Sequence, residues 1–122
     1  MKSNFLILSC LMALLLLTSC KSAPDQHITY FNLAEHNLKV AEETQEPKDQ
    51  EKYYIQALMN YYKYIVFTDT SKASGDAKME LNPDDGETLI EAKIKAKKCK
   101  TALKDRFNRN CIFQESVTIR PE

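Results

Sequence analysis

The fold of this chain is decided by the stretch Tyr53-Tyr54-Ile55-Gln56-Ala57-Leu58-Met59-Asn60-Tyr61-Tyr62-Lys63-Tyr64-Ile65-Val66-Phe67. Wound as a helix, it carries apolar residues on nearly every side, and such a helix needs neighbours that cover it on two sides. Asp49 and Glu51 lie near the positive end of the helix dipole. We therefore predict a helix that starts around residues 48–50 and runs to about Phe67, packed between other elements.

Five of the six tyrosines lie in this helix, and two interpretations of them are open. As amphipathic core and rim residues, each would bury its ring and bring its hydroxyl to water. Alternatively, some of them line a groove for a partner protein. The candidates for partner binding are Tyr54, Tyr61, Tyr62 and Tyr64.

A helix is predicted on each side of the central one. From Ile28 to about Glu43, apolar residues recur at spacings of three and four, and Pro47 separates this segment from the next. Further on, Asn82-Pro83-Asp84-Asp85 is typical of a helix start. The helix that follows has a narrow apolar seam formed by Leu89, Ala92, Ala96, Cys99 and Leu103.

The charged residues favour a solvated surface. The chain has 17 basic and 17 acidic residues, so its net charge calls for no anionic partner. The lysine-rich face of the third helix lacks interleaved aromatic residues, so we interpret it as solvent-facing and expect no nucleic acid partner. Residues 68–77 are rich in Ser, Thr and Asp and predict a loop.

Two cysteines of the domain, Cys99 and Cys111, are expected to form a disulfide. At 1.5 Å per residue, a continuous helix would place them about 18 Å apart, whereas bridged Cα atoms lie about 4.4–6.8 Å apart. The third helix must then end by about Phe107 and the chain must double back. Alternatively, Cys99 is a small apolar residue of the seam and Cys111 is a free thiol. Residues 112–119 predict a short strand or an extended tail.

The N-terminal residues have the layout of an export signal, with Lys2 before an apolar run from Phe5 to Leu17. The run has about 13 residues, fewer than the roughly 20 of a transmembrane helix. Leu17-Thr18-Ser19-Cys20 resembles the lipobox of bacterial lipoproteins. The resemblance implies cleavage before Cys20 and lipidation of its thiol; Lys21, which is not an inner-membrane retention signal, implies the outer membrane. A plain secretory signal or an uncleaved anchor is the alternative.

The domain organisation follows from these elements. We expect a signal peptide over residues 1–19, a lipidated tether over 20–26 and a helical domain over 27–122. Two glycines, four prolines and no tryptophan argue against an all-β domain. The fold class is therefore predicted to be all-α, a small bundle of about three helices with a short extended C-terminal tail.

Part of the helical domain resembles tetratricopeptide repeats. The resemblance is carried by residues 81–85 at a helix junction, by Leu89, Ala92 and Ala96 after it, and by Ala57 and Tyr61. It covers about a third of the chain after Cys20, without a second copy. It implies a degenerate, TPR-like helical hairpin followed by a third helix, in a family that binds peptides or proteins.

A catalytic function is not expected. His27 and His36 lack the spacing of zinc ligands, and the sequence has no phosphate loop or nucleophile elbow. We expect no cofactor and no metal. The interpretation is a lipid-anchored protein of the cell envelope, facing the periplasm, that acts as a protein-interaction module, such as an adapter or assembly factor of an envelope complex. The alternatives are a surface-displayed lipoprotein and, less favoured, a periplasmic enzyme.

Overall fold

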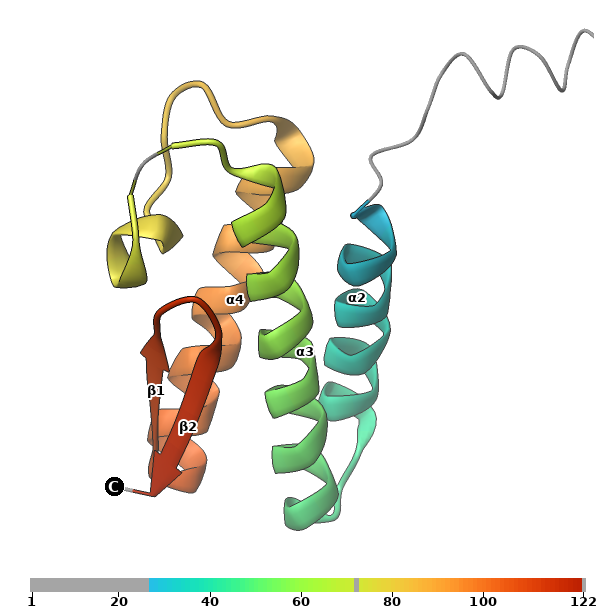
Figure 1. The fold of residues 1–122 in the computed structure, drawn as a ribbon. Helices are drawn as coiled ribbons and strands as arrows, with labels where there is room; N and C mark the ends of the chain where they lie inside the picture. The colour runs from blue at the N-terminus through green and yellow to red at the C-terminus, as the bar shows by residue number, and fades with distance from the viewer. Residues whose placement is uncertain (1–26, 72, 122) are drawn as a thin grey trace, which may run out of the picture.

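The computed structural model describes residues 27–71 and 73–121. The predicted signal peptide, lipidation site Cys20 and tether lie outside the described residues. The described elements are α2 (Ile28–Glu43), α3 (Pro47–Thr68), the 3₁₀ helix η1 (Gly75–Met79), α4 (Glu87–Phe107), β1 (Arg109–Phe113) and β2 (Val117–Pro121) (Figure 1). The prediction of a mostly helical domain with three helices is confirmed.

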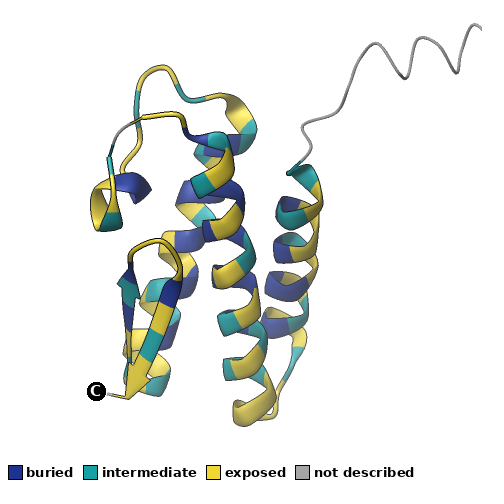
Figure 2. Ribbon diagram, viewed as in Figure 1, coloured by how far each residue is buried: buried dark blue, intermediate teal, exposed yellow. Residues whose placement is uncertain are grey.

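The long helix α3 lies between α2 and α4 and packs against both (Figure 1). This arrangement confirms the prediction of a helix covered on two sides. Figure 2 shows the buried residues of α2 on the side turned toward α3. Alanines let the helix backbones approach closely, and five of them are fully buried: Ala34, Ala41, Ala57, Ala92 and Ala96.

The first two helices have nearly the predicted bounds. α2 spans Ile28–Glu43, and the amide of Thr44 donates to the carbonyl of Val40 over 2.9 Å where the helix ends. α3 begins at Pro47, slightly earlier than residues 48–50. Proline fits this first position because the first amides of a helix have no intrahelical acceptor.

The third helix, α4, begins at Glu87, so the predicted start at Asn82 is wrong. Asn82–Asp85 instead form a turn in which the amide of Asp85 donates to the carbonyl of Asn82 over 3.1 Å. The carboxylate of Asp85 accepts from the amide of Asn82 over 2.9 Å and pairs with Lys93 over 2.8 Å. The position of Asp85 is thus set by a partner in α4 rather than by helix capping.

The polar segment between α3 and α4, residues 69–86, is held in place by contacts with other parts of the domain. Gly75 has φ +63°, and a Cβ at this residue would lie 3.2 Å from the backbone oxygen of Phe113; both features favour glycine. The ammonium of Lys78 donates to the carbonyls of Asp69 over 2.9 Å and Ser71 over 2.8 Å. These contacts make a defined structure of a segment whose composition predicts only a loop.

The C-terminal tail is an antiparallel β-hairpin. Asn108 ends α4 in the left-handed region with φ 54°, a conformation that asparagine tolerates better than most residues. The chain then reverses, and β1 pairs with β2 so that Phe113 lies opposite Val117. Both side chains are buried, and the Phe113 ring lies 5.1 Å from that of Tyr62. The sheet is a small β-element on an otherwise α-helical domain.

The expected disulfide is not present in the structure, because Cys99 and Cys111 are both buried free thiols. α4 ends at Phe107 and the chain doubles back as a bridge would require, but the turn at Asn108 and the hairpin accomplish this without one. Burial raises the pKa of the Cys99 thiol to about 12, although Lys98 opposes the shift. Burial also raises the pKa of Cys111, so both thiols are protonated at neutral pH.

Candidate functional site

The structure buries the four tyrosines that were candidates for partner binding. The exposed fractions of Tyr54, Tyr61, Tyr62 and Tyr64 are 3%, 0%, 2% and 2%. Their assignment to the core is confirmed. Burial leaves little of these rings accessible to a partner, although Tyr62 is among the residues that line an apolar groove on α3, and Tyr54 and Tyr64 line two other pockets. Their part in partner binding stays a prediction.

The hydroxyl groups of three of these tyrosines form hydrogen bonds with polar partners on other elements. The Tyr61 hydroxyl donates to Glu35 Oε1 over 2.6 Å, the Tyr62 hydroxyl donates to the carbonyl of Gln114, and the Tyr54 hydroxyl accepts from Arg106 over 3.4 Å. Burial, followed by the hydrogen bond to Glu35, raises the pKa of Tyr61. These phenols join α3 to α2, α4 and the hairpin.

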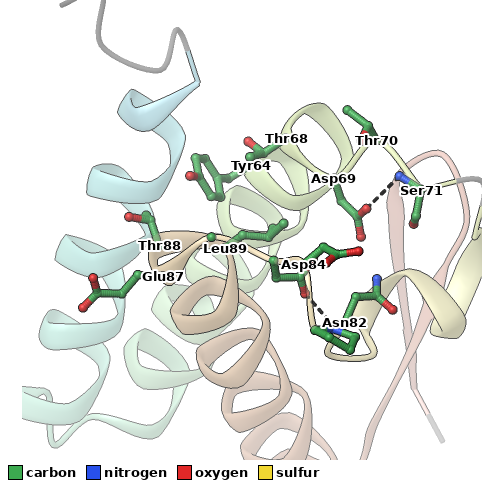
Figure 3. Close-up of a pocket in the computed structure, with 13 residues that line it drawn as sticks. Tyr64, Thr68, Asp69, Thr70, Ser71, Asn82, Asp84, Glu87, Thr88 and Leu89 are labelled. Atoms are coloured by element: carbon green, nitrogen blue, oxygen red, sulfur yellow. Dashed lines mark hydrogen bonds between the residues drawn. The ribbon is translucent and has the colours of Figure 1, made fainter.

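A polar pocket of about 660 Å³ lies at the end of the domain where α3 stops and α4 starts. Figure 3 shows the side chains around it, which come from the end of α3, the 69–86 segment and the first turn of α4. Hydroxyl and carboxylate side chains make up most of the lining. The acidic residues are Asp69, Asp84, Asp85 and Glu87.

Lys93 lies within an ion network beside this pocket. Its side chain is fully buried, and its ammonium lies 2.9 Å from Asp69 Oδ2 and 2.8 Å from Asp85 Oδ2. It also donates to the carbonyl of Glu80 over 2.9 Å. A buried ammonium is costly unless charge and hydrogen bonds compensate it, and here three partners from one connecting segment do so. Lys93 thereby holds that segment against α4.

The network keeps its members charged. Burial opposes the charge on Lys93, but hydrogen bonds to Asp85 and Asp69 prevail and raise its pKa. Burial likewise opposes the charge on Asp69, yet the hydrogen bond from Lys93 and those from Ser71 lower its pKa to about 2. A general acid or base works best with a pKa near the ambient pH. The Lys93–Asp69 pair is tuned away from that range and stabilises the fold.

Sequence reasoning missed Lys93 because it counted the lysine among the solvent-facing residues of its helix. A signal was present in the spacing. Lys93 follows Leu89 by four residues and precedes Ala96 by three, so it lies on the edge of the buried seam. A lysine at such a position, with acidic residues just before the helix, indicates a buried ion pair.

An apolar groove of about 390 Å³ lies on the outer face of α3, beside the tip of the hairpin. Met59 and Phe67 are 42% and 51% exposed, and Val66 and Val117 continue the apolar lining. The polar rim includes Lys63 on α3 and Glu115 on the hairpin tip. We call this surface the α3 groove.

The remaining candidate groups do not converge on a reactive centre. His36 is exposed on α2, and His27 lies at its start against the Phe67 ring. Over residues 27–71 and 73–121, no group of three metal-ligating side chains comes together. None of the helices in these ranges has both the length and the hydropathy needed to cross a bilayer.

No protein-family model matches the chain, and no curated protein or solved structure matches it either.

Proposed function

We propose that this chain is a lipid-anchored protein of the cell envelope whose helical domain binds another protein. The anchor is the thiol of Cys20, and support for it comes from Leu17-Thr18-Ser19-Cys20 after an apolar run. Two or three acyl chains would hold the protein on a membrane that it does not span. In this proposal the membrane is the outer membrane and the domain faces the periplasm.

The observation that carries the binding function is the α3 groove. Large apolar side chains are exposed along one helix face, and a contiguous apolar surface with a polar rim is typical of a protein-interaction site. The groove follows a helix and is open at the surface, which suits the apolar face of an amphipathic helix. Lys63 and Glu115 on the rim offer one charge of each sign to orient it.

Binding is favoured over catalysis by the state of the charged groups. The polar pocket where α3 stops and α4 starts includes four carboxylates, but Lys93, the buried lysine beside it, is held in two ion pairs. The resemblance to tetratricopeptide repeats also points to binding. We propose on this basis that the α2–α3 hairpin is a single degenerate repeat unit that serves in an envelope complex as an adapter or assembly factor.

The anchor is tested by metabolic labelling with an alkyne fatty acid, followed by membrane fractionation. The wild-type protein should carry the label and sediment with outer membranes, and Cys20→Ala should lose both properties. Label on Cys20→Ala would contradict the assignment of Cys20. Digestion of intact cells with protease separates the periplasmic orientation from surface display, since only a displayed domain would be cut.

The binding function is tested by crosslinking in cells and affinity capture of the anchored protein. We compare wild type with Met59→Glu, which places a charge in the groove, and with the control Ile94→Glu. Ile94 lies on α4, outside the groove, and is 54% exposed. Loss of one specific partner in Met59→Glu alone is expected. An unchanged pattern would contradict the groove as the binding site.

A further inference from the structure

Three aromatic side chains gather where α2 begins and α3 ends. The rings of His27 and Phe67 stack with centroids 4.6 Å apart, and the Tyr30 ring lies 5.9 Å from that of Phe67. The ammonium of Lys63 lies 5.2 Å from the Tyr30 centroid. Phe67 is about half exposed. We call His27, Tyr30 and Phe67 the aromatic cluster. The start of α2 and the end of α3, which carry it, lie at the same end of the domain (Figure 1).

This end of the domain is the one nearest along the chain to Cys20. Only seven residue steps separate Cys20 from His27, and even a fully extended chain of that length spans at most about 25 Å. Acyl chains on Cys20 would therefore keep the aromatic cluster within about 25 Å of the lipid headgroups. The opposite end of the helices has no such restriction.

The chemistry of the cluster fits a bilayer surface. Aromatic side chains with a polar atom favour the headgroup region, where one part of the ring is in apolar surroundings and the other is hydrated. Tyr30 has this character, and Phe67 supplies the purely apolar ring. Lys63 can lay its methylene groups along the apolar surface and keep its ammonium among the headgroups.

We propose that the aromatic cluster docks on the bilayer that carries the lipid anchor, with Phe67 and Tyr30 at the level of the headgroups. This inference rests on the proposed anchor at Cys20. It gives the domain a fixed orientation, in which the start of α2 and the end of α3 face the membrane. Phe67 and Lys63 also line the α3 groove, so docking places that end of the groove at the membrane surface and leaves Gln56, Met59 and the hairpin tip accessible to a protein partner.

The charges at the end of the domain that carries the aromatic cluster determine which lipids are sufficient for docking. The exposed Asp84 lies in the segment that leads into α4, and the exposed Glu87 is the first residue of α4; the start of α4 lies at the same end of the domain as the cluster (Figure 1). These carboxylates oppose the attraction of Lys63 to anionic lipids. Docking is therefore driven by burial of aromatic surface, and a zwitterionic bilayer suffices.

Tryptophan fluorescence tests the proposal directly, because the chain has no tryptophan. The acylated protein is reconstituted in phosphatidylcholine vesicles as Phe67→Trp, with Tyr30→Trp as a second reporter. Ile94→Trp is the matched control, since Ile94 is 54% exposed and belongs to α4. Circular dichroism verifies that each variant retains its helices.

We expect the emission of Phe67→Trp and Tyr30→Trp to shift to shorter wavelength in vesicles relative to detergent-free solution of the unacylated chain. Lipids with a quencher near the headgroup should reduce this emission, and Ile94→Trp should show neither effect. Emission of both cluster reporters that is unchanged by vesicles would overturn the proposal. Equal shifts at all three positions would also overturn it, because the domain would then have no preferred face.

A second attachment separates this inference from the anchor itself. The chain from Cys20 onward is coupled chemically to a maleimide lipid. This attachment does not depend on whether cells lipidate Cys20. Cys99 and Cys111 are buried and their thiol pKa values are raised, so coupling is directed to Cys20. Shifted emission after coupling, without fatty-acid labelling in cells, would support docking and refute the natural anchor. The reverse result would support the anchor and refute docking.

Discussion

Two regions of this domain place side chains in an environment that is unusual for them. Around Lys93 a charge lies inside the protein, and on the outer face of α3 large apolar side chains lie outside it. In the first region the buried charge is fully compensated, because Asp69 and Asp85 neutralise the lysine. In the second region the apolar side chains are not covered, because Met59 and Phe67 remain exposed to solvent. The buried charges therefore serve the fold, whereas the exposed apolar face is the proposed place for a partner.

The largest expected effect on stability comes from the ion network around Lys93. Lys93→Met should destabilise the domain by about 3–5 kcal/mol, because it leaves two buried carboxylates without their cation. Urea unfolding followed by circular dichroism measures the change. Lys97→Met is the matched control on the same helix, since its ion pair with Glu80 is exposed and 3.4 Å long; it should cost about 0–1 kcal/mol. Equal costs for the two variants would refute the structural role of the network.

The same network predicts a loss of stability in acid. The pKa of Asp69 is about 2 in the folded protein, below its ordinary value of 3.8. The folded state therefore favours the charged form, so the contribution of Asp69 is complete above about pH 4 and is lost as the pH falls toward 2. It is on the order of 2 kcal/mol. Unfolding measured between these pH values should show a shallower pH dependence in Asp69→Asn than in wild type.

A smaller effect is expected where a buried tyrosine reaches a charged partner. Tyr61→Phe removes the hydroxyl that donates to Glu35 over 2.6 Å and should cost about 1.5 kcal/mol. Tyr53→Phe, at a half-buried ring of the same helix, should change the free energy of unfolding by less than about 0.5 kcal/mol. Indistinguishable unfolding curves for the two variants would show that the Tyr61 hydroxyl does not join α3 to α2.

The smallest effect on stability is expected on the exposed face. Met59→Glu should change the free energy of unfolding by about 0.5 kcal/mol or less, because residue 59 is already 42% exposed. Its effect should appear in partner capture instead. A large loss of stability would mean that Met59 contributes to the core, and the contrast between the two regions would then fail.

The regular parts of the fold were predictable from local patterns. Spacings of three and four located α2 and the seam of α4, and the all-round apolar character of α3 predicted its central place. The start of α4 was not predictable in this way. Asn82-Pro83-Asp84-Asp85 suits a helix cap and a turn equally well by composition, and the choice depends on Lys93, which lies eight residues beyond Asp85.

The candidate site was less predictable than the fold. Tyr61 and Tyr53 have the same side chain, but only tertiary packing determines that one is buried and the other half-buried. Phe67 counts as a core residue by hydropathy, yet it ends α3 at the surface. The hairpin turn at residues 114–116 contains no glycine, proline or asparagine, so the strongest turn signals are absent. Exposure of the α3 face depends on where the hairpin stops, which no local pattern encodes.

We propose that the outer face of α3 contacts a protein partner while Cys20 holds the domain on a membrane. Site-specific photocrosslinking in living cells tests it most directly, with the photoreactive residue at position 59 in wild type and in Cys20→Ala, and at position 94 as control. We predict one discrete crosslinked species from position 59 that disappears in Cys20→Ala, and none from position 94. The same products from both positions, or no product from position 59, would contradict the account.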